Sequence, residues 1–92
     1  MEEYKDYYHQ RTHLIVDGRA YNAGTFSSES GGMSIELEAT PISESESLLR
    51  LENIVFTNGY KNFYNSPWGD IKKDYIIGIF ALPQTEELPQ TE

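Results

Sequence analysis

Hydrophobic and polar side chains alternate most regularly over residues 33–40, where Ile35, Leu37 and Ala39 are separated by polar residues. A period of two is typical of a β-strand, and the polar alternate positions predict that one face of the strand is wet. Pro41 follows directly and has no N–H to give to a neighbouring strand. We therefore expect a strand that ends or bulges at the proline.

Residues 48–65 contain two β-rich runs that meet at Asn58-Gly59. This dipeptide tolerates the left-handed dihedrals of a two-residue type I′ turn, so the pattern predicts a β-hairpin. In its first strand, the apolar residues keep to one face only if Asn53 forms a β-bulge. The residues expected on the inward face are Leu49, Leu51, Ile54 and Phe56.

Three further stretches complete the pattern. Residues 11–26 predict a second hairpin, in which Asp17-Gly18 is the turn between a β-branched run and residues 19–23. Residues 66–70 have the composition of a turn. Residues 73–82 are apolar at both alternate sets of positions, which is typical of a central strand covered on both faces.

Together these stretches predict an all-β fold, a small antiparallel barrel or sandwich of about six strands arranged as a meander of hairpins. Residues 1–82 would form a single β domain, with residues 1–10 as an N-terminal arm or short helix. Residues 83–92, rich in Pro, Gln, Thr and Glu, would form an extended polar tail. The possibility of a helix near the N-terminus rests on the helical spacing of Tyr4, Tyr7 and Tyr8.

The net charge of the chain indicates which kinds of partner it can bind. The 92 residues include 15 acidic and 7 basic side chains, a formal net charge of −8. Such a chain repels phosphate, so nucleic acid and anionic membranes are excluded as expected partners. A protein with a basic surface is the complementary partner; the alternative is that the charge only keeps a small domain soluble.

Cysteine is absent, which excludes disulfides, cysteine metal sites and thiol catalysis. Because small secreted domains often need disulfides, this absence favours a cytoplasmic protein. The acidic N-terminus does not resemble a signal peptide, and no apolar run approaches the ~20 residues that span a bilayer.

One candidate binding site is aromatic. Large aromatic side chains alternate with amides and charges over residues 57–70, and such side chains are enriched at binding hot spots. The alternative is that they fill the inner face of the sheet. The candidate partner-binding residues are Tyr60, Phe63, Tyr64 and Trp68.

A second candidate site is acidic. Glutamates gather in residues 29–52, where Arg50 is the one basic residue. Arg50 is expected to face Glu36 or Glu38 across the sheet. An acidic face could steer association with a basic target; the alternative is an ordinary solvated face. Glu44 and Glu46 are expected to lie in a polar loop with ordinary pKa values. The candidate acidic residues are Glu36, Glu38, Glu44 and Glu46.

No pattern predicts catalysis. His9 and His13 have the spacing of a two-histidine zinc motif, but Gln10 stands where that motif needs glutamate. The serines form no nucleophile motif, and the glycines form no phosphate loop. We expect no enzyme activity, no cofactor and no metal.

One resemblance bears on function. Residues 15–22 are similar to the opening hairpin of several small phage tail and connector proteins, and residues 79–83 are compatible with that likeness. These two short stretches carry no site residues across. The first hypothesis is a small acidic protein that occludes a larger, basic protein, as an inhibitor, immunity protein or phage host-takeover factor does. The second is a self-assembling structural subunit, such as a phage tail or connector component, which implies a homo-oligomer.

Overall fold

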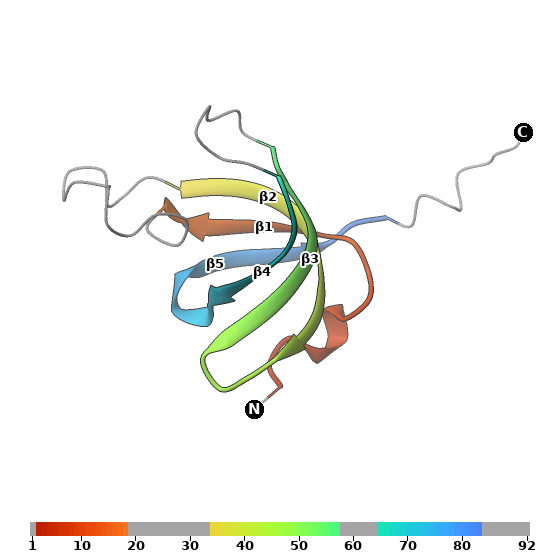
Figure 1. The fold of residues 1–92 in the computed structure, drawn as a ribbon, viewed down its shortest axis with the longest axis vertical. Coiled ribbons are helices and arrows are strands. Elements are labelled where there is room, and N and C mark those ends of the chain that lie inside the picture. Colours follow the sequence, from red (N-terminus) through yellow and green to blue (C-terminus); the bar gives the residue numbers. More distant parts are fainter. Residues whose placement is uncertain (1, 19–33, 58–64, 84–92) are drawn as a thin grey trace, which may run out of the picture.

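The computed structural model describes residues 2–18, 34–57 and 65–83, and its elements are five strands and two short 3-10 turns (Figure 1). The turns are η1 (Lys5–Tyr7) and η4 (Lys73–Tyr75). The strands are β1 (Thr12–Asp17), β2 (Ser34–Glu44), β3 (Leu48–Phe56), β4 (Ser66–Lys72) and β5 (Ile76–Ala81). The predicted all-β class is confirmed, and in place of an N-terminal helix the chain has the single turn η1. The predicted polar tail lies outside the described residues from residue 84 onward.

All five strands belong to one antiparallel sheet with the order β4-β3-β2-β1-β5. The predicted meander is confirmed for β1 to β4, whereas β5 returns to pair with β1 at the far side of the sheet. The prediction of a central strand over residues 73–82 was wrong, because β5 is an edge strand that follows a 3-10 turn. Its apolar residues are not covered on both faces: Ile79 packs on the core, whereas Ile77 and Phe80 are 63% and 54% exposed.

The predicted second hairpin was also wrong. Strand β1 pairs with β2 along one edge and with β5 along the other, so described strands already occupy both of its edges. Asp17 pairs with Ser34 instead, and the intervening residues 19–33 lie outside the described part of the chain. A turn pair is a local signal, and here the longer, regular pairing with β2 outweighs it.

The hairpin of β3 and β4 exists, but its register is not that of a two-residue turn. Ile54 pairs with Ser66, whereas a turn at Asn58-Gly59 would pair it with Phe63. The turn itself lies outside the described residues. The stretch predicted as a turn at 66–70 is strand β4, in which Pro67 is tolerated because β4 lies at the edge of the sheet.

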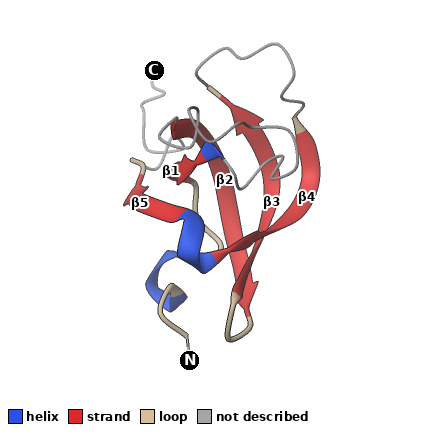
Figure 2. Cartoon of the chain, turned by 90° about the vertical axis from the view of Figure 1, so that its left-hand side faces the viewer, coloured by secondary structure: helices blue, strands red, loops and turns tan. Residues whose placement is uncertain are grey.

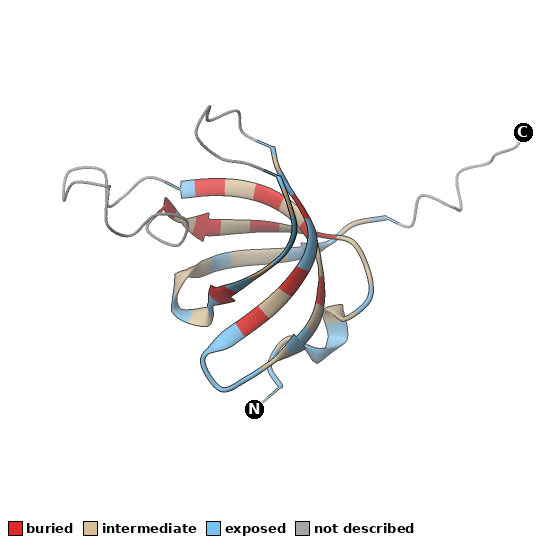
Figure 3. Ribbon diagram, viewed as in Figure 1, coloured by how far each residue is buried: buried red, intermediate tan, exposed pale blue. Residues whose placement is uncertain are grey.

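Buried and less buried residues alternate along β1 and β2 of the curled sheet (Figure 3), so the core lies on one face, the concave face around which the strands curl. Leu14 of β1, between β2 and β5, has no exposed surface. The predicted inward face of β3 is confirmed, with Phe56 partly buried against the core. Asn53 has a φ of 54°, and the β2–β3 register shifts beside it, so the predicted bulge is present. The buried apolar residues are Leu14, Val16, Ile35, Leu37, Ala39, Leu49, Leu51, Ile54 and Ile71.

Pro41 does not end the strand; β2 continues to Glu44 and bulges just after the proline. The register shifts between Pro41, which faces Leu51, and Ser43, which faces Arg50. Beyond this bulge Glu44 pairs with the buried Leu49, on the inner side of the sheet. Figure 2 shows η1 close to the N-terminus, and the Lys73 side chain of η4 reaches toward it, with Nζ 6.0 Å from the centre of the Tyr4 ring.

Candidate functional site

The convex face of the sheet carries the largest exposed aromatic side chains of the described residues. Trp68 on β4 is 57% exposed, and Phe80 on β5 is 54% exposed. Trp68 therefore does not fill the inner face of the sheet, which was the alternative to a role in binding. The other predicted aromatic contacts, Tyr60, Phe63 and Tyr64, lie outside the described residues.

Trp68 is held in place by an ion pair between the neighbouring strands. Arg50 and Asp70 are direct partners across β3 and β4, and they form two hydrogen bonds, Nε to Oδ1 at 2.5 Å and Nη2 to Oδ2 at 3.2 Å. The guanidinium carbon lies 4.4 Å from the centre of the Trp68 ring. The guanidinium is thus held by Asp70 at its edge and lies over the Trp68 ring, which restricts the indole before any partner arrives.

The same ion pair shifts both pKa values. Hydrogen bonding to Asp70 raises the pKa of Arg50, and hydrogen bonding to Arg50 lowers the pKa of Asp70. Both groups therefore stay charged at neutral pH. The prediction that Arg50 faces Glu36 or Glu38 was wrong, because the side chain reaches toward β4 rather than β2.

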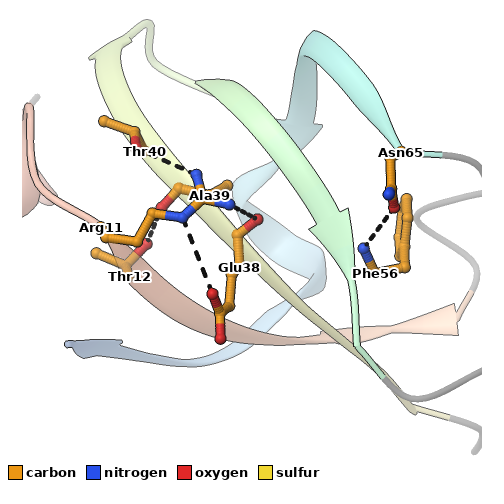
Figure 4. Close-up of polar contacts among 7 residues, drawn as sticks. All are labelled: Arg11, Thr12, Glu38, Ala39, Thr40, Phe56 and Asn65. Carbon is orange, nitrogen blue, oxygen red and sulfur yellow. Dashed lines mark hydrogen bonds and ion pairs between the residues drawn. The ribbon is translucent and has the colours of Figure 1, made fainter. Parts of the chain in front are cut away.

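Glu36 and Glu38 lie on the convex face of β2, and each lies close to a basic side chain on or next to β1. His13 Nε2 lies 3.4 Å from Glu36, and Arg11 Nε lies 3.9 Å from Glu38. Figure 4 shows that Arg11 also donates to the Thr40 hydroxyl and the Glu38 carbonyl, both at 3.3 Å. These carboxylates are half-exposed, so they still contribute negative potential to the face.

Glu44 and Glu46 are placed very differently from one another. Glu46 is exposed in the turn between β2 and β3, whereas the Glu44 side chain has no exposed surface. The Glu44 carboxylate accepts hydrogen bonds from the backbone N–H of Glu3 at 3.0 Å and of Tyr4 at 2.8 Å. It also binds Lys73 Nζ at 2.6 Å, and accepts from the Tyr8 hydroxyl at 3.1 Å.

We call these groups, Glu44 with Lys73, Tyr8 and the two backbone N–H groups, the Glu44 cluster. Burial alone would raise the pKa of Glu44, but the hydrogen bonds from Lys73, Tyr4 and Tyr8 outweigh burial and lower it. The expectation of an ordinary pKa in a polar loop was therefore wrong. Burial and the hydrogen bond to Glu44 raise the pKa of Tyr8 to about 12. The cluster joins the η1 region, β2 and η4, so the Glu44 carboxylate is occupied by contacts within the fold.

The lowered pKa of Glu44 predicts a specific loss of stability in acid. The folded state binds fewer protons at Glu44 than the unfolded state does, so this contribution is complete above the ordinary glutamate pKa of about 4.3 and is lost as the pH falls through the lower folded value. We expect urea midpoints to fall on acidification below that pH, and to fall less steeply in Glu44→Gln. Glu46→Gln, which changes an exposed neighbour, should follow the wild-type slope; equal slopes in all three proteins would contradict the prediction.

Two side chains of the convex face were not predicted as exposed or paired in this way. Phe80 was assigned to a covered strand, and Arg50 was assigned to the wrong partner. The alternation of Arg50 with Glu52 on β3 and of Trp68 with Asp70 on β4 is the signal that could have found the pair, once residues 66–70 are read as a strand.

An apolar hollow of about 190 Å³ opens on the concave side of β2, β3 and β4. The residues that line it include Phe56, Trp68, Gly69 and Ile71. Among the described residues no group of three potential metal ligands comes together, and His9 and His13 do not form such a group. The hollow and the convex face both offer apolar contact area.

Within the described ranges, no helix is long and apolar enough to cross a membrane. Comparisons with protein-family models, with curated proteins and with solved structures found no match to this chain.

Proposed function

We propose that this protein binds a larger, basic protein and acts by covering that protein's functional surface, in the manner of an inhibitor, an immunity protein or a phage host-takeover factor. The observation that carries the proposal is the exposed Trp68, ordered by the Arg50–Asp70 pair. Trp and Arg are the residue types most enriched at binding hot spots, and a side chain fixed in advance loses less entropy on binding.

The charge pattern supports a basic target. Glu36 and Glu38 share the convex face with Trp68, and Glu52 is its direct partner on β3. Negative potential around an aromatic contact accelerates encounter with a positive surface and disfavours acidic partners. Tyr60, Phe63 and Tyr64 precede Trp68 in the chain and remain candidate contacts beside it. The proposed location is the cytoplasm.

Replacing Trp68 by Ala should weaken binding to the target by about 2 kcal/mol or more, roughly 30-fold in the dissociation constant. The target would be isolated on the immobilised chain, purified, and titrated by calorimetry. Because Trp68 is largely exposed, the urea midpoint should change little. Trp68→Phe should keep part of the affinity, and Ile77→Ala, an exposed apolar residue on the opposite edge of the sheet, is the matched control. Unchanged affinity in Trp68→Ala would refute this site.

A self-assembling structural subunit is the second candidate function. The observation that favours it is the apolar edge of β5, which carries no charged residue. Light scattering at low and high salt separates the two functions. A ring or larger oligomer promoted by salt supports the subunit, because salt screens the like charges. A monomer or dimer at both salts supports the binding protein.

A further inference from the structure

The two edges of the sheet are built differently. Strand β4 carries Pro67, Asp70 and Lys72, which are the features that protect an edge strand from pairing with another chain. Strand β5 has the sequence Ile-Ile-Gly-Ile-Phe-Ala, without a proline or a charge. Within the described part of the chain no strand pairs with its outer edge.

The outward backbone groups of β5 can be identified from its register with β1. Leu82 N–H donates to the Arg11 carbonyl at 3.0 Å, and the pairing continues through Thr12 with Ala81 and His13 with Phe80. Because hydrogen-bonded and non-bonded pairs alternate in an antiparallel ladder, Phe80 and Gly78 face β1 with their backbone groups. The N–H and C=O groups of Ile79 and Ala81 therefore point away from the sheet.

We propose that β5 pairs with β5 of a second copy of this chain, antiparallel about a two-fold axis at Ile79. Such a pairing places Phe80 of each copy opposite Gly78 of the other, so a large side chain always meets a position without one. The Phe80 ring already lies toward Gly78 within one chain, where its Cε2 atom is 3.2 Å from the position a Cβ would occupy. Pairs of an aromatic residue with an edge glycine stabilise neighbouring strands.

Charge permits a second copy to pair at β5, although it opposes self-association elsewhere on the surface. Each chain has a formal charge of −8, which opposes close packing of most of its surface against itself. Strand β5 is the part of the sheet where two copies meet without bringing like charges together. Trp68, Arg50 and Asp70 lie on β3 and β4, toward the other edge of the sheet, and stay open in this dimer. Dimerisation through β5 therefore neither depends on binding of the proposed target nor competes with it.

Ala81→Pro tests the pairing at the free edge. It removes an N–H that no partner within the sheet uses, and Ala81 is exposed, so the fold should be kept. Sedimentation equilibrium of the wild type should give a reversible dimer that tightens with salt, and Ala81→Pro should raise its dissociation constant by at least about tenfold. Ala81→Thr, which keeps the N–H, is the matched control and should remain dimeric.

A second pair of variants tests the dimer independently, in case Ala81→Pro disturbs the fold. Ile77→Lys places a charge on the apolar edge, whereas Val55→Lys makes the same change at a 38% exposed position on β3. The dimer should be lost in Ile77→Lys and kept in Val55→Lys, with unchanged circular dichroism in both. A wild type that stays monomeric at several hundred micromolar overturns the proposal, even if β5 captures an extended peptide of another protein. A dimer that survives both Ala81→Pro and Ile77→Lys also overturns it.

Discussion

Replacing Glu44 by Ala lowers the free energy of unfolding by about 3–5 kcal/mol, the expected cost of removing one partner from a buried ion pair. Lys73 Nζ would lose its carboxylate while its side chain is only 7% exposed, and the N–H groups of Glu3 and Tyr4 would lose their acceptor. A domain of this size has a total stability of about 5–15 kcal/mol, so the loss is large. Urea denaturation followed by circular dichroism measures it.

The control is a double-mutant cycle with Lys73→Met. Removing both charges leaves no unpaired ion, so Glu44→Ala with Lys73→Met should cost clearly less than the sum of the single changes. Additive losses would show that the two side chains do not stabilise each other. A loss below about 1 kcal/mol in Glu44→Ala, the usual value for an exposed pair, would mean that the cluster is not buried in solution.

Leu14→Ala is the second change with a large expected effect, a loss of about 2–5 kcal/mol in the free energy of unfolding. Leu14 has no exposed surface and lies on β1 between β2 and β5, so the cavity left behind cannot be filled by one neighbouring strand alone. The adjacent Ile15 points to the convex face and is the matched control; Ile15→Ala should cost clearly less. Equal losses for the two residues would contradict the assigned faces of β1. The measurement is again the urea midpoint.

Local patterns predicted the strands where one face is buried and the other is wet. The alternation over residues 33–40 became β2, and the shift of phase at Asn53 correctly predicted the bulge in β3. In both cases the hydrophobic pattern itself fixes which residues must face inward. The pattern failed for Trp68, because an exposed aromatic residue between a proline and a glycine has the composition of a turn although it lies on an edge strand.

The order of the strands in the sheet could not be predicted from the hydrophobic pattern within each strand. Whether β5 is central or at the edge depends on its pairing with β1, at least 60 residues earlier, and nothing within residues 73–82 specifies that partner. The inward turn of Glu44 had the same kind of cause. It follows from the bulge after Pro41 and from four partners distant in sequence. The local sequence around Glu44 is the same whether the side chain is exposed in a loop or buried, so it could not predict the burial.

The pairing of the first and last strands also bears on the order of events during synthesis. Thr12 pairs with Ala81 and Val16 with Ile76, so β1 cannot pair with β5 until the whole intervening chain has been synthesised. At about 5–20 residues per second, that interval is on the order of seconds. During it, β1 to β4 can form a meander whose β1 edge is open. The emergence of β5 from the ribosome is then the step that closes this edge and completes the core.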